Sequence, residues 1–145
     1  MRSAEHVYTV TDYFDGPRAG IADVDGDLHV YRSMYLDTGE DDEDRFEVSP
    51  ISRETLDLAL ESWAMFVRWR QAFDAGGTTI ATHPALPEDR ARSDYLDAIL
   101  KSALAIDPER RRLFHGKFTV RAPKSADLPK GVLRPFEVTW TPVDG

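Results

Sequence analysis

Apolar and polar residues alternate with a period of two over much of the first fifty residues, the pattern of β-strands. In residues 27–36 one set of alternate positions is apolar and the other is mostly aromatic or polar. Valine, tyrosine and threonine, which suit a pleated and half-buried surface, recur in neighbouring segments. The strands predicted in this region are Val7–Tyr13, Ala19–Val24, Asp27–Leu36 and Arg45–Val48.

The dipeptide Asp25-Gly26 predicts a two-residue hairpin turn, because both central positions of a type I′ turn need positive φ. Such a turn pairs Asp23 with Leu28 across the two strands. Cross-strand partners point to one face, and neighbours along a strand point to opposite faces. We therefore expect Asp27 and His29 to share a face, with Asp23 on the other.

A long helix is predicted over Arg53–Asp74. Ser52 is a suitable N-cap residue, and Gly76-Gly77 ends the helical pattern. Apolar side chains cover well over half of its circumference, whereas a surface helix needs an apolar stripe of only about 100°. We expect this helix to pack on two sides, or to pack on one side and offer the other to a partner.

A second helix is predicted over Pro87–Ala103, followed by two strands at Phe114–Arg121 and Val132–Thr141. The order is then four strands, two helices and two strands. This order predicts a single α+β domain spanning residues 1–145, with a mainly antiparallel sheet packed against the long, broadly apolar central helix.

The composition, 41% hydrophobic and 30% charged over 145 residues, is typical of a soluble globular protein. No apolar run approaches the roughly 20 residues of a membrane-spanning helix. The first residues lack the features of a signal peptide, so a cytoplasmic location is expected. The chain has no cysteine, which excludes disulfides, thiolate metal sites and cysteine nucleophiles. We expect no cofactor and no metal.

Charge is distributed unevenly along the chain. Residues 1–107 carry 10 basic and 22 acidic side chains, and residues 108–145 carry 8 basic and 4 acidic ones. The steepest part is the acidic segment Asp37–Glu47, where Arg45 is the only base among Asp37, Glu40, Asp41, Asp42, Glu43, Asp44 and Glu47. Our leading hypothesis is a non-catalytic protein–protein interaction module (an inhibitor, an immunity-type protein or a subunit of a complex) whose acidic segment meets a basic partner.

The second hypothesis is a small-molecule-binding domain or enzyme with a pocket between sheet and helix. No phosphate-loop, dinucleotide, HExxH or GxSxG pattern supports a particular reaction. The candidate residues are Arg70, His83, Asp27 and His29. Arg70 lies within the apolar arc of the predicted helix, where it would need an anionic partner if buried, or would extend its charge to water. Loops commonly carry functional sites, which favours His83; the pair Asp27 and His29 has too few ligands for a metal.

A third hypothesis concerns the basic end of the chain, with Arg110, Arg111, Arg112, Lys117, Arg121, Lys124, Lys130 and Arg134. These side chains could contact nucleic acid, but binders of that kind usually have a strongly basic domain, and this chain has a net charge of −8. Neutralisation of the acidic half within the molecule is the favoured interpretation.

The chain contains the segments YFDGPRAGIAD, PISRETLDLALESW, FVRW and THPALPEDR. These segments resemble those of a group of small uncharacterised bacterial proteins, which open with an FDGPR-G-AD stretch and continue to a loop containing THPALP. The resemblance covers residues 12–92. It implies a self-standing bacterial domain, and it assigns no activity and no catalytic residues.

Overall fold

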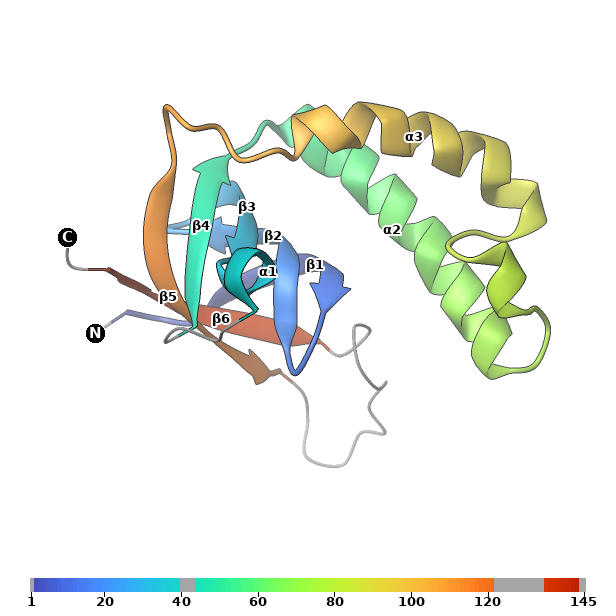
Figure 1. The fold of residues 1–145 in the computed structure, drawn as a ribbon, viewed down its shortest axis with the longest axis horizontal. Helices are drawn as coiled ribbons and strands as arrows, with labels where there is room; N and C mark the ends of the chain where they lie inside the picture. Colours follow the sequence, from blue (N-terminus) through green and yellow to red (C-terminus); the bar gives the residue numbers. More distant parts are fainter. Residues whose placement is uncertain (1, 40–43, 122–134, 144–145) are drawn as a thin grey trace. The chain divides into compact units, whose positions relative to one another are not determined.

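The computed structural model describes residues 2–39, 44–121 and 135–143. The chain divides into two compact units, which are described separately below. One unit comprises Met1–Ile51 together with Ile106–Gly145, and the other comprises Ser52–Ala105. The first unit contains the strands and the second contains the two long helices (Figure 1).

The first unit is a closed antiparallel β-barrel of six strands. Each strand pairs with the next one along the chain, and the first strand pairs with the last through Glu5 and Val138, which closes the barrel. A four-residue helix, α1 (Tyr35–Thr38), follows the third strand. The strands are β1 (Glu5–Tyr13), β2 (Pro17–Val24), β3 (Asp27–Ser33), β4 (Arg45–Pro50), β5 (Arg112–Val120) and β6 (Phe136–Pro142).

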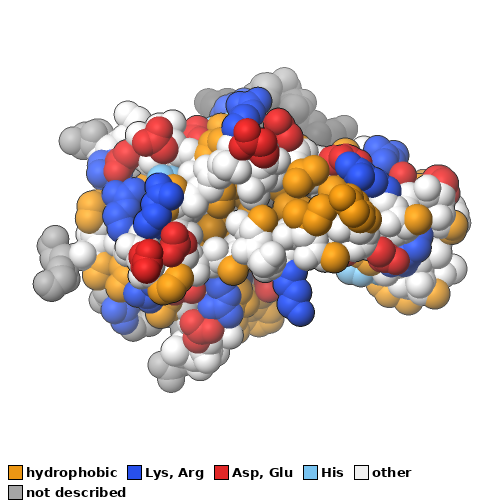
Figure 2. Space-filling view, turned by 90° about the horizontal axis from the view of Figure 1, so that it is seen from above, with side chains coloured by type: hydrophobic (Ala, Val, Ile, Leu, Met, Phe, Trp, Pro, Cys, Tyr) orange, Lys and Arg blue, Asp and Glu red, His pale blue; other side chains and the backbone are white. Residues whose placement is uncertain are grey.

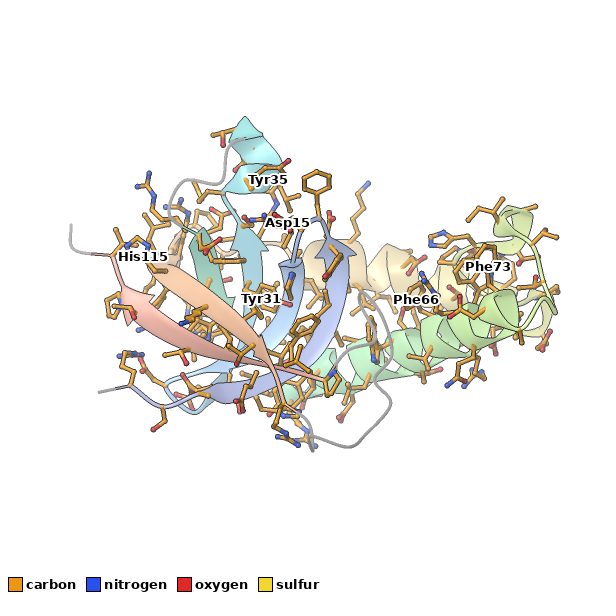
Figure 3. All side chains as sticks on the ribbon, turned by 90° about the horizontal axis from the view of Figure 1, so that it is seen from below. Asp15, Tyr31, Tyr35, Phe66, Phe73 and His115 are labelled. Carbon is orange, nitrogen blue, oxygen red and sulfur yellow. The ribbon has the colours of Figure 1, made fainter. Side chains whose placement is uncertain are left out.

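Alternate side chains of these strands fill the barrel interior. Tyr31 is fully buried and points into the barrel (Figure 3), where its ring lies within 6.0 Å of those of Phe46 and Trp140. The alternation of side chains along each strand places the other core residues on the same inner face of the barrel. The buried core consists of Ala22, Val24, Tyr31, Phe46, Val48, Phe114, Val138 and Trp140.

Gly20 lets two polar groups meet inside this core. The hydroxyl of Tyr31 donates a hydrogen bond of 3.0 Å to the carbonyl oxygen of Thr9. A Cβ atom at Gly20 would collide with that carbonyl and would lie 2.7 Å from the hydroxyl. Burial raises the pKa of the Tyr31 phenol well above its usual value, so the residue stays a neutral donor.

The second unit is a helical hairpin, the name used below for Ser52–Ala105. It contains α2 (Arg53–Asp74), two short 3₁₀ turns, η1 (Ile80–Thr82) and η2 (Pro87–Asp89), and α3 (Arg90–Ala103). Trp69 of α2 is 3% exposed and donates a hydrogen bond of 2.9 Å to Thr82 in the connection. Among the described helices, none is long and apolar enough to cross a membrane.

Two ion pairs join the elements of the helical hairpin. Arg92 of α3 contacts Glu61 of α2 through two hydrogen bonds of 2.6 and 2.8 Å, and Arg68 contacts Asp89 through two of 3.0 Å. The hydrogen bond from Arg92 holds the pKa of Glu61 below its ordinary value. The stabilisation from this pair is therefore present above the ordinary carboxyl pKa and is lost as the pH falls through the lowered one.

The predicted α+β arrangement, a sheet packed against the long central helix, is wrong. The sheet closes on itself through the pairing of β1 with β6, and a closed barrel covers its own apolar face without a helix. The predicted order of four strands, two helices and two strands matches the order of the six strands with α2 and α3, but the structure adds the short helix α1 between β3 and β4. The order alone does not reveal closure, because the closing strands stand at opposite ends of the sequence.

Several local predictions are confirmed. Asp25 and Gly26 have φ of 54° and 83°, and Asp23 pairs with Leu28. The side chain of Ser52 caps α2 by accepting a hydrogen bond from the amide of Thr55.

The prediction that the third strand reaches Leu36 is wrong, because β3 ends at Ser33. The hydroxyl of Ser33 accepts a hydrogen bond of 3.1 Å from the amide of Tyr35. This local bond offers the backbone an alternative to the sheet ladder, and α1 begins there.

Substitution of Gly20 tests the close packing of the barrel. We expect Gly20→Ala to lower the free energy of unfolding by about 2 kcal/mol or more, because the backbone of Thr9 cannot yield as a flexible side chain can. Gly77→Ala is the control, since a Cβ there meets its nearest neighbour at an ordinary 3.5 Å. Urea unfolding of both variants measures the difference; equal stabilities would contradict the packing described for Gly20.

Candidate functional site

The inner face of β3 changes from apolar to polar towards the β2–β3 turn. His29 precedes Tyr31 by two residues, so both side chains belong to the inner face, and His29 is only 3% exposed. Arg112 precedes the buried Phe114 by two residues and pairs with Val48, another core residue. Strand alternation therefore brings His29 and Arg112 to the inner face at the same end of the barrel.

Both ring nitrogens of His29 have partners. Nδ1 lies 2.8 Å from the backbone carbonyl oxygen of Asp27, which can only accept, so Nδ1 carries the hydrogen. Nε2 lies 3.2 Å from a terminal nitrogen of Arg112, which can only donate. The arrangement therefore requires a neutral imidazole whose Nε2 lone pair faces the guanidinium.

The guanidinium of Arg112 has two further neighbours, an aromatic ring and a carboxylate. It lies over the ring of Phe114, at 5.1 Å from the centroid, and one of its nitrogens is 3.7 Å from the carboxylate of Asp25. Asp25 in turn forms an ion pair with Arg2. Nearly half of the Arg112 side chain remains exposed (48%), so its charge is available to a ligand.

The β2–β3 turn is fixed by a carboxylate from β1. Glu5 accepts hydrogen bonds from the backbone amides of Asp25, at 3.0 Å, and Gly26, at 2.7 Å. Successive amides with positive φ form a small concavity suited to an anion, and here the protein's own carboxylate occupies it. The turn thus holds Asp25 beside Arg112.

These residues adjoin a surface cavity of about 600 Å³, which we call the mouth cavity. This volume falls within the ordinary range for small-molecule sites, and the mouths of β-barrels are among their usual places. All of its lining belongs to the barrel unit: Asp27, Leu28, His29, Pro50, Ile51, Arg110 and Arg112.

Two of the four candidate residues from the sequence line this cavity, and two do not. Asp27 and His29 are brought together there. Arg70 lies on α2 with its side chain 37% exposed and forms an ion pair of 3.2 Å with Asp74, so its charge extends to water. His83 is exposed and packs edge-on against Trp69, at 4.7 Å between ring centroids. Among the described residues, no group of three His, Asp or Glu side chains could hold a metal.

The acidic segment is partly neutralised within the molecule. Asp37 accepts a hydrogen bond of 2.8 Å from Arg32, and Glu47 accepts one of 2.6 Å from Arg111. Asp44 is exposed, while Glu40, Asp41, Asp42 and Glu43 lie outside the described residues. On the face shown in Figure 2, acidic and basic side chains lie next to one another rather than in separate patches.

The basic end of the chain does not act as one group. Arg111 pairs with an acid of β4, as the interpretation of internal neutralisation expects, whereas Arg110 and Arg112 line the mouth cavity. This division between Arg111 and its two neighbours was not predicted from the sequence. The available signal was the alternation of side chains along a strand. Arg112 and the buried aromatic Phe114 are two residues apart, so their side chains lie on the same face. Lys124, Lys130 and Arg134 lie outside the described residues.

Comparisons with protein-family models, with curated proteins and with solved structures find no match. The resemblance to a group of bacterial proteins therefore stays a prediction.

The protonation pattern of His29 can be measured directly. At pH 8 we expect a neutral imidazole with the hydrogen on Nδ1, because the Asp27 carbonyl accepts only from a protonated nitrogen. Long-range proton–nitrogen correlation NMR distinguishes the two neutral tautomers. A hydrogen on Nε2 at this pH would contradict the contacts described for Asp27 and Arg112.

Proposed function

We propose that the barrel unit binds a small molecule bearing an oxyanion, a phosphate or a carboxylate, in the mouth cavity. The observation that carries this proposal is that two arginines, Arg110 and Arg112, and the buried His29 line one cavity of about 600 Å³. In a chain with a net charge of −8, this local excess of cationic side chains needs a specific explanation.

Arginine is well suited to this role. Its planar guanidinium donates two parallel hydrogen bonds to a carboxylate or phosphate. Arg110 is exposed at the cavity, and Arg112 is held over an aromatic ring, which limits the side-chain entropy lost on binding. A hydrogen bond to a charged group contributes about 1.5–3 kcal/mol, roughly a factor of ten or more in affinity.

The other residues that line the mouth cavity indicate which further groups the ligand carries. Leu28, Pro50 and Ile51 provide an apolar wall. Asp27, exposed at the cavity, provides a carboxylate that accepts hydrogen bonds from a hydroxyl or an amine. We therefore expect an anionic molecule that also carries an apolar part and a hydrogen-bond donor.

The arrangement favours a small ligand over nucleic acid, the third hypothesis from the sequence. A polymer is bound by a continuous basic surface that follows its backbone. Arg111, between the two cavity arginines in sequence, is engaged by Glu47, and Arg112 has the carboxylate of Asp25 beside it. These acids interrupt the basic surface.

The proposal is tested by calorimetric titration with simple probes at constant ionic strength. Sulfate represents a phosphate group, acetate a carboxylate, and a short single-stranded oligonucleotide a polymer. Arg110→Gln and Arg112→Gln should each weaken binding of the preferred small anion about tenfold, through loss of a charge-assisted hydrogen bond.

Arg111→Gln is the matched control, with the same change of charge at a neighbouring position outside the cavity. We expect its affinity to stay within about twofold of the original, since exposed charges are screened by salt. Two results would overturn the proposal: neither small anion binds, or Arg111→Gln loses as much affinity as the cavity variants. Preferential binding of the oligonucleotide would support nucleic acid instead.

We propose as a second candidate that the acidic segment meets a protein partner with a basic surface. The observation that favours it is the density of charge, because seven acids face one base in Asp37–Glu47. Electrostatic attraction of this kind mainly accelerates association.

This second candidate is tested by replacing Glu40, Asp41, Asp42 and Glu43 with amides. Association with a basic partner isolated from the host should then slow about tenfold or more at low salt and little at high salt. The control removes four acids elsewhere, by amide substitutions at Glu54, Asp57, Glu88 and Asp94. Equal rates for the two variants would exclude a specific role for the acidic segment.

A further inference from the structure

We infer that the mouth cavity takes up a proton on His29 when it binds an oxyanion. This inference rests on the proposed function and adds to it the protonation state of the liganded site. It follows from the way in which His29 and Arg112 contact each other.

In the structure, the neutral imidazole of His29 has no hydrogen-bond donor free for an anion. The Nδ1 hydrogen is donated to the Asp27 carbonyl at 2.8 Å. The Nε2 lone pair faces Arg112 at 3.2 Å, and a lone pair repels an oxyanion. The same contact occupies one of the donor nitrogens of Arg112.

Protonation changes both partners at once. Nε2 then carries a hydrogen and becomes a donor, so it can no longer accept from Arg112. Two cationic donors that faced each other are now both free to donate to a third group. An oxyanion between them accepts from Nε2 of His29 and from the guanidinium of Arg112, while the bond from Nδ1 to the Asp27 carbonyl is kept.

The charges around His29 make this proton dependent on the ligand. The charged side chains beside His29 in the empty cavity are Arg112 of β5 and Arg110, just before that strand, whereas Pro50 and Ile51 at the end of β4 are apolar. Asp27 at the rim and Asp25, already engaged by Arg2 and close to Arg112, provide the nearby negative charge. A bound oxyanion adds negative charge directly against the imidazole and so favours the protonated form.

The test uses sulfate, whose charge does not change over the pH range in which histidine titrates. Sulfate affinity of the whole chain is measured by calorimetry from pH 8.5 to pH 5.5, at constant ionic strength, in buffers of different ionisation enthalpy. We expect the affinity to rise about tenfold as the pH falls, the effect of one added charge-assisted hydrogen bond. A tenfold rise corresponds to a shift of one pH unit in the protonation midpoint of His29, so uptake of up to about half a proton per sulfate should accompany binding where the affinity changes most steeply.

His29→Gln keeps a polar side chain but cannot titrate, and it should bind sulfate with little dependence on pH. His83→Gln, in the helical hairpin, is the matched control and should keep the full dependence, which separates His29 from the general rise in positive charge at low pH. Should His29→Gln fail to fold, NMR titration of the original protein gives the same information: the protonation midpoint of His29 should move to higher pH when sulfate is added.

The outcomes separate this inference from the proposed function. Sulfate binding that needs Arg110 and Arg112 but is independent of pH, with no proton uptake, would overturn the inference and leave the proposed function standing. Equal pH dependence in His29→Gln and His83→Gln would overturn it in the same way. Absence of sulfate and acetate binding at every pH would overturn both.

Discussion

Closure of the barrel is the constraint on which the rest of the structure depends. A sheet that pairs its first strand with its last has one inner face, and every second side chain of each strand must occupy it. In the middle of the strands these positions are filled by a dense group of aromatic and branched side chains around Tyr31. At one end of β3 and β5 the same alternation continues after the apolar core has ended, and the inner positions there are the polar residues His29, which is buried, and Arg112, which is nearly half exposed.

The candidate site is a direct consequence of this geometry. His29 and Arg112 are inner-face residues two positions before Tyr31 and Phe114. The pairing of β4 with both β3 and β5 brings them within 3.2 Å of each other although they are far apart in sequence. The neighbouring turn is held by Glu5, a residue of the strand that closes the barrel. The fold that encloses the core therefore also assembles a cationic cavity in an acidic protein.

The sequence predicted local structure well because local structure depends on nearby residues. The Asp25-Gly26 turn, the cap at Ser52 and the extent of α2 all follow from signals within a few positions. Barrel closure depends on the pairing of Glu5 with Val138, and no local pattern specifies it.

The same distinction applies to the site. Asp27 and His29 were identified from hairpin register alone, whereas Arg110 and Arg112 were seen only as part of a basic stretch. The position of Arg112 depends on a ladder between β4 and β5, strands separated by the whole helical hairpin, and Arg110 precedes that ladder by two residues. Arg70 attracted attention because of its helical angle, but its neighbour Asp74 one turn later draws its charge outward.

The central claim is that the alternation of side chains along β3 and β5 places an anion-binding site at the mouth of the barrel. The most direct measurement is a sulfate titration at constant ionic strength, followed by the NMR resonances of the backbone amides and the arginine Nε–H groups. The account predicts saturable shifts that centre on residues 27–29, Arg110 and Arg112, with the helical hairpin unchanged. Shifts that do not saturate, or that centre on arginines outside the mouth cavity, would contradict it.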